Sequence, residues 1–134
     1  LDLNCIKHSS NQKIQKNTDI YLVDSYGESS KFYNLTNVSF VGGSIIKHGG
    51  QNPLEPARLG NYIIYGPNIK NFKEIYTFLN KLKMSSSTSN ILTMENLILK
   101  KLKTKNTNKN IKKIIKIGND VLEKNLFYIN KYLI

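Results

Sequence analysis

The stretch with the clearest chemical potential is residues 40–60, which read FVGGSIIKHGGQNPLEPARLG. It joins the end of a predicted strand to the start of a predicted helix, and it carries the glycine pairs Gly42-Gly43 and Gly49-Gly50. Glycine lets a backbone approach a ligand closely because it has no side chain. In a parallel sheet such a loop lies at the carboxyl ends of the strands, which is where ligands bind. These residues therefore predict a ligand-binding loop.

The polar residues after the second glycine pair suit either a sugar or a helix end. Asn52 followed by Pro53 is typical of an N-cap with proline at the first helical position. Glu55 then falls in the first helical turn, where the positive end of the helix keeps a carboxylate ionised. Such a carboxylate can accept hydrogen bonds from both hydroxyls of a ribose. Alternatively, Glu55 closes a capping box with Asn52, and the residues alone leave both roles open.

The elements that position this loop alternate between strand and helix. Short runs of branched and aromatic residues predict strands, and apolar residues at helical spacing predict helices. The predicted strands are residues 19–24, 38–41 and 62–65, and the predicted helices are 28–37, 53–59 and 71–83. This order indicates an α/β fold, with a parallel Rossmann-like sheet and helices on its faces. Residues 84–90, MSSSTSN, are predicted to form a loop, residues 92–103 a helix, and residues 103–110 a polar connector.

The C-terminal segment is the most periodic part of the chain. Six apolar residues recur there at intervals of three, four or seven: Ile111, Ile115, Leu122, Leu126, Ile129 and Leu133. They predict one face of an amphipathic helix over about residues 109–132. We expect this face to pack on the rest of the chain, and binding to a membrane surface is the alternative. The expected organisation is thus a core over residues 1–83 and a helical region over residues 84–134 that packs on it.

Composition narrows the classes of partner. The net charge is +11, but Arg58 is the only arginine among 20 basic residues. Proteins that read nucleic acids favour arginine, whose planar fork pairs with guanine and phosphate, so no nucleic-acid partner is predicted. Residues 70–134 carry fourteen basic and four acidic groups, which suits an anionic membrane surface. One cysteine and two histidines argue against a disulfide framework or a metal site. The absence of an initiator methionine suggests a fragment or an interior start.

Four motifs in register give the chain a family resemblance. They are Asp24 with Gly27 and Glu28, then Val41 to Ser44, then Gly49 to Pro56, and finally Gly66-Pro67 with Asn71-Phe72. This order resembles the C-terminal part of the 3-deoxy-D-manno-octulosonic acid (Kdo) transferases, which act in lipopolysaccharide assembly. The resemblance is dense over residues 19–75 and looser afterwards.

The resemblance implies a fold, a donor and an acceptor. The family has two Rossmann-like domains of the GT-B type with the active site between them, and the C-terminal domain holds CMP-Kdo without a metal or other cofactor. Kdo passes to a lipid A precursor at the cytoplasmic face of the bacterial inner membrane. By motif, Tyr26, Gly27 and Glu28 are expected to contact the CMP moiety. Asn52, Pro53, Leu54 and Glu55 are expected to form the second wall, with Glu55 on the ribose.

Two departures from the family pattern qualify this expectation. Gln51 stands where the family usually has histidine, so a cationic role at that position is lost. The family's general base lies in its N-terminal domain and has no counterpart here, so no catalytic residue is expected in these 134 residues. The alternatives are a truncated remnant that at most binds a nucleotide, and a GT-B glycosyltransferase that uses another sugar nucleotide.

Overall fold

The computed structural model describes residues 2–104 and 108–133, and the chain divides into two compact units, Leu1–Phe32 and Tyr33–Ile134. This division differs from the expected boundary between residues 83 and 84. The reason is that residues just after that boundary form a strand, β5 (Ser85–Ser87), in the same sheet as two earlier strands. The segment from residue 84 onward is therefore part of the core as well as a source of helices.

The first unit contains two short parallel strands. β1 (Cys5–Lys7) pairs with β2 (Ile20–Leu22), with Cys5 opposite Ile20 and Lys7 opposite Leu22, and the 3-10 turn η1 (His8–Ser10) follows β1. The His8 ring packs edge-on against Tyr21 and Phe32, and its Nδ1 lies 2.8 Å from the Tyr21 hydroxyl. The strand predicted over residues 19–24 is thus present but shorter. It is not buried, because Ile20 and Leu22 stay 42% and 45% exposed.

The second unit is built on a three-stranded parallel sheet. The strands β3 (Val38–Val41), β4 (Tyr62–Tyr65) and β5 lie in the order β3-β4-β5. Val38 is opposite Tyr62 at one end of the first pair, and Tyr65 is opposite Ser87 at the far end of the second. The predicted strands at 38–41 and 62–65 and their parallel arrangement are confirmed.

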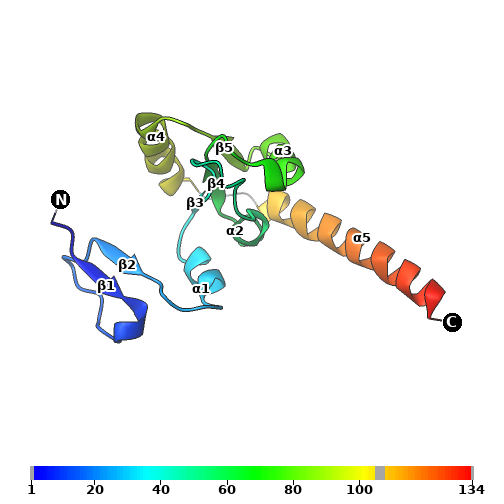
Figure 1. Cartoon of the computed structure of the whole chain (residues 1–134), viewed down its shortest axis with the longest axis horizontal. Coiled ribbons are helices and arrows are strands. Elements are labelled where there is room, and N and C mark those ends of the chain that lie inside the picture. Colours follow the sequence, from blue (N-terminus) through cyan, green and yellow to red (C-terminus); the bar gives the residue numbers. More distant parts are fainter. Residues whose placement is uncertain (1, 105–107, 134) are drawn as a thin grey trace. The chain divides into compact units, whose positions relative to one another are not determined.

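Helices cover both faces of this sheet, as Figure 1 shows for α4 on one side and α2 and α3 on the other. Short α1 (Ser29–Tyr33) precedes β3. The remaining elements are α2 (Leu54–Arg58), the 3-10 turn η2 (Lys70–Phe72), α3 (Lys73–Lys81), α4 (Ile91–Leu102) and α5 (Asn108–Tyr132). The predicted helices at 28–37, 53–59, 71–83 and 92–103 are therefore present with shifted ends, and the Rossmann-like α/β class is confirmed.

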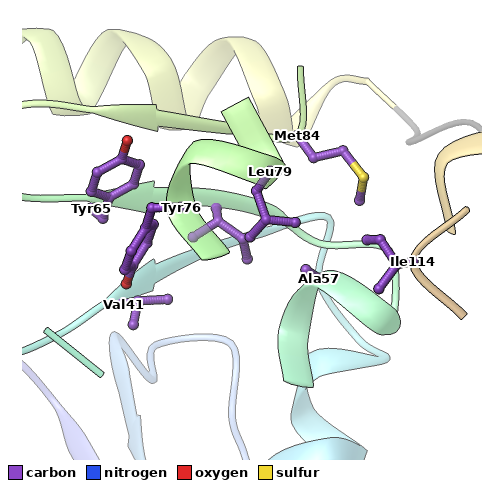
Figure 2. Close-up of a cluster of buried hydrophobic side chains, with 8 residues drawn as sticks. Val41, Ala57, Tyr65, Tyr76, Leu79, Met84 and Ile114 are labelled. Atoms are coloured by element: carbon purple, nitrogen blue, oxygen red, sulfur yellow. The ribbon is translucent and has the colours of Figure 1, made fainter. Parts of the chain in front are cut away.

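The core lies where β4 meets α3. Ile63 and Tyr65 belong to one buried cluster with Tyr76 and Leu79 of α3. The centroids of the Tyr65 and Tyr76 rings lie 4.2 Å apart, and Figure 2 shows these two rings side by side. The alternate residue Tyr62 faces α4, where the Lys101 ammonium lies 3.8 Å from its ring centroid. Because both faces of β4 are covered, all four of its residues are buried, as the unbroken apolar run YIIY requires.

Helix α5 departs from the expectation that its apolar face packs on the domain. Ile114 is 4% exposed and belongs to the core cluster, but Leu122, Leu126 and Ile129 are 57%, 47% and 53% exposed. The packing prediction is wrong for these later turns. The helix that α5 contacts most, α2, has only five residues and so covers about one or two turns of a 25-residue partner.

Candidate functional site

The loop after β3 is fixed at its base by a buried serine. The hydroxyl of Ser44 donates to the Val41 carbonyl at 2.6 Å and accepts from the Gly66 amide at 2.8 Å, and Ser44 has no exposed surface. The Asn68 amide donates to the Ser44 carbonyl at 2.8 Å. These bonds tie the loop after β3 to the loop after β4. Ser44 therefore joins both loops at the carboxyl edge of the sheet.

Asn71 packs against the second glycine pair, Gly49-Gly50. The Asn71 amide donates to the Gly49 carbonyl at 3.1 Å, and a Cβ placed on Gly49 would lie 2.5 Å from the Asn71 side-chain nitrogen. Gly49 and Gly50 also have positive φ angles of 103° and 81°, which side-chain-bearing residues rarely adopt. The sequence therefore needs glycine here for backbone geometry and for space.

The loop continues onto α3 through Tyr76. Its hydroxyl donates to the Gln51 carbonyl at 3.1 Å, and burial, with a smaller effect of Tyr65, raises the pKa of Tyr76 to about 12. The Gln51 side chain is exposed, so it is available to a ligand. The backbone of residue 51 is thus held by the core while its side chain faces solvent.

Helix α2 begins one residue later than predicted. Pro53, not Asn52, occupies the N-cap, and the Asn52 side-chain oxygen accepts the Leu54 amide at 3.0 Å. Proline has no amide hydrogen to leave unpaired there. The expected side-chain capping by Asn52 is therefore present in shifted register. Pro53 is buried, Leu54 is half-buried, and Asn52 and Glu55 are exposed.

Glu55 lies in the first turn of α2, as predicted. Burial raises the pKa of the Tyr33 hydroxyl, and the negative charge of Glu55 raises it further. The Tyr33 carbonyl accepts the Asn61 side-chain amide at 2.7 Å. The exposed Glu55 carboxylate is thus close to Tyr33, whose backbone carbonyl is bound by Asn61.

The other predicted residues lie in the first unit. Tyr26 is fully exposed, and Gly27 has a φ of 81° with open space where a Cβ would be. Glu28 pairs with Lys31 at 2.7 Å, and this hydrogen bond holds the pKa of Glu28 below its usual value. Nearby, Asp24 accepts the Ser9 amide at 3.0 Å and the Ser9 hydroxyl at 2.7 Å, which lowers the pKa of Asp24. The motif from Asp24 to Glu28 is thus a turn that is exposed over residues 24–27 and half-buried at Glu28, with the pKa of both carboxyl groups lowered.

The structure places the predicted residues 52–55 together at the start of α2. It places the predicted residues 26–28 together in a turn of the first unit. The two groups belong to different compact units, and their roles as ligand contacts stay predictions. The supporting functions of Ser44, Asn71 and Tyr76 were not foreseen. The motifs contain Ser44 and Asn71, but only the fold shows that they fix the glycine loop.

Two further features bear on ligands. Among the described residues, no group of three or more His, Cys, Asp or Glu side chains could hold a metal ion. No helix within residues 2–104 and 108–133 is both long and apolar enough to cross a membrane.

Comparison with known proteins gives consistent matches. No protein-family model matches the chain. A 3-deoxy-D-manno-octulosonic acid transferase of Haemophilus influenzae is 43% identical over 74 residues, which are 55% of this chain and 17% of that protein. The enzyme of the same description from Rickettsia bellii is 31% identical over 137 residues, covering 98% of this chain and 32% of that protein. The chain thus spans about a third or less of the length of these curated relatives.

One solved structure resembles the fold over most of its length. It is the crystal structure of the C-terminal CMP-Kdo binding domain of WaaA from Acinetobacter baumannii, with a TM-score of 0.70 and 29% sequence identity. The match covers 90% of this chain and 61% of that one. Sequence and structure therefore place the similarity in the same family and in its C-terminal part.

Proposed function

Because the chain belongs to the Kdo transferase family and corresponds to its C-terminal segment, we propose that it supplies the wall that binds CMP-Kdo in a glycosyltransferase. The observation that carries this proposal is the similarity to a domain described as CMP-Kdo binding, over 90% of this chain. The rigid glycine loop and the exposed polar turn after it supply a surface suited to a nucleotide.

Glu55 is the proposed ribose ligand. Its carboxylate is exposed in the first turn of α2, directly after a loop whose backbone is fixed by Ser44, Asn71 and Tyr76. A carboxylate carried on an ordered backbone can accept both ribose hydroxyls without the entropic cost of ordering a mobile loop. Asn52, Pro53 and Leu54 would form the adjoining wall.

Tyr26, Gly27 and Glu28 are the proposed CMP contacts of the first unit. The positive φ of Gly27 turns the chain sharply with open space at its Cα, so a ligand can approach the backbone there. Tyr26 offers an exposed ring for stacking, and the ion pair with Lys31 keeps Glu28 in its charged, hydrogen-bond-accepting form.

The reaction proposed for the complete enzyme is transfer of Kdo from CMP-Kdo to a lipid A precursor, at the cytoplasmic face of the inner membrane. We place the general base in the N-terminal domain of a GT-B arrangement, and we propose that no metal takes part. The excess of lysine in residues 70–134, fourteen basic against four acidic groups, supports contact with an anionic membrane surface.

Nucleotide selectivity tests the proposal. Isothermal titration of the chain with CMP, UMP and GMP should give measurable binding of CMP and weaker or no binding of the other two. Preference for UMP or GMP would favour a glycosyltransferase with another donor. Absence of binding for all three, with a folded chain by circular dichroism, would contradict the proposal.

A further inference from the structure

A pocket of about 580 Å³ lies at the carboxyl edge of the β3-β4-β5 sheet. Lys47 and Gly49 line it from the loop after β3, and Pro67, Asn68, Ile69 and Lys70 line it from the loop after β4. Lys73, the first residue of α3, completes the lining. Pockets at the carboxyl edge of parallel strands are the usual ligand sites of this class of fold.

The charge of this pocket has one sign. Its three ionisable lining residues are Lys47, Lys70 and Lys73, and within the part of the chain that the structure describes no carboxylate lines it. The lysines come from three different elements: a loop, η2 and the start of α3. The amino end of α3 adds the positive pole of a nine-residue helix that no side chain caps, and Glu74 in the first turn of that helix does not line the pocket. All of these features favour an anion.

The walls of the pocket are held in place before any ligand arrives. The Asn68 side chain donates to the Ile45 carbonyl at 2.8 Å, and its backbone amide donates to the Ser44 carbonyl at the same distance. Gly49 is fixed by the Asn71 amide at 3.1 Å. Pro67 and Ile69 give the pocket apolar walls that suit the organic body of an ester.

From this combination we propose that the pocket binds a phosphate monoester group, separately from the nucleotide on Asn52–Glu55. A phosphate monoester carries a charge near −2 at neutral pH and three acceptor oxygens, which matches three lysine ammonium groups. Lysine is a common phosphate ligand that acts as a point charge. The phosphate can come from a free phosphate ester or from the headgroup of phosphatidic acid, since both are phosphate monoesters.

The test compares two triple variants that remove the same charge. K47Q/K70Q/K73Q removes the pocket lysines, and K112Q/K113Q/K116Q removes three lysines of α5. Binding of inorganic phosphate and of glucose 6-phosphate is measured by isothermal titration, without nucleotide. We expect the pocket variant to bind about ten- to hundredfold more weakly than the unaltered chain, because charge-assisted hydrogen bonds are lost. The α5 variant should bind as the unaltered chain does. Circular dichroism of both variants establishes that they are folded.

A second arm separates the two sources of phosphate. Co-sedimentation with phosphatidylcholine vesicles, with and without phosphatidic acid, is measured for the same three proteins. Loss of binding confined to the pocket variant supports the proposal. A loss in the titration identifies a free ester as the source, and a loss in the vesicle assay identifies a lipid headgroup. Equal losses in both variants would show attraction by net charge alone and would overturn it. So would the absence of binding to every probe. Because no nucleotide is used, these outcomes do not depend on the CMP assignment.

Discussion

At the scale of single residues, the site depends on a carboxylate whose position is set by its neighbours. Glu55 follows a turn in which Asn52 accepts the Leu54 amide at 3.0 Å and Pro53 is buried. The turn therefore places Glu55 without help from a long helix, since α2 has only five residues.

Replacing Glu55 by glutamine tests that role. The amide keeps the shape but loses the charge, so we expect CMP binding to weaken by about 1–3 kcal/mol. Titration calorimetry measures the change, and Glu95→Gln, an exposed position on α4, serves as the control. Unchanged affinity in the Glu55 variant, with the fold intact, would favour a purely structural role for this side chain.

Two glycines offer a matched pair of stability predictions. Gly49→Ala forces a side chain onto a φ of 103° and into the Asn71 side chain, so it should lower the free energy of unfolding by about 1–3 kcal/mol. Gly118→Ala, in the middle of α5 where an added Cβ would meet nothing within 4 Å, should raise the free energy of unfolding by about 0.5–1 kcal/mol. Urea denaturation measures both changes. A Gly49 variant as stable as the unaltered chain would show that the loop relaxes.

At the scale of elements, α5 is packed at its start and exposed along the rest of its length. Ile114→Ala should cost about 2–5 kcal/mol because Ile114 is buried in the core. Leu122→Ala should cost well under 1 kcal/mol because Leu122 is 57% exposed, and surface changes are usually within about 0.5 kcal/mol. Chemical denaturation of the two variants measures the loss of unfolding free energy in each. A large loss at Leu122 would mean that another surface covers this face in solution.

The contrast between β4 and β5 shows which elements the sequence could reveal. YIIY is an unbroken apolar run, and such a run predicts a strand covered on both faces. Ser85–Ser87 has no apolar residue, so the predicted loop at 84–90 is wrong over these three positions. The strand pairs with β4 through its backbone, and side-chain hydrogen bonds add to this pairing: Ser85 donates to Asn80 at 2.5 Å, and the Ser86 and Tyr62 hydroxyls lie 2.5 Å apart. Partners that lie 5 and 24 residues away leave no local pattern.

The site shows the same division between local and distant information. Motif and spacing located the glycine loop and the first-turn position of Glu55, because both depend on residues that are close in sequence. They did not show that Ser44 bonds Gly66, or that Tyr76 holds Gln51, because those contacts join positions 22 and 25 residues apart. Amphipathic periodicity likewise predicted the helix α5, but periodicity does not report how long the covering surface is.

At the scale of the whole molecule, the proposed function gives this chain one side of a two-substrate reaction. It spans 32% of the Rickettsia bellii relative, and we place both the general base and the acceptor site in the N-terminal domain of the complete enzyme. We therefore expect the purified 134-residue chain to form no Kdo-bearing product from CMP-Kdo and a lipid A precursor. A positioned base alone contributes about 10²–10⁴-fold, and proximity of the two substrates is lost as well. Turnover above background, detected by mass spectrometry, would show that the chain carries its own base.

The most direct test of the central claim is a titration of the isotope-labelled chain with CMP, followed by amide nuclear magnetic resonance. We predict shifts at Asn52 and Glu55 in the second unit and at Gly27 and Glu28 in the first. Residues 119–132 of α5 should stay unchanged, which provides an internal control. Shifts confined to other regions, or no shifts at saturating CMP, would contradict the assignment of this chain as the wall that binds CMP-Kdo.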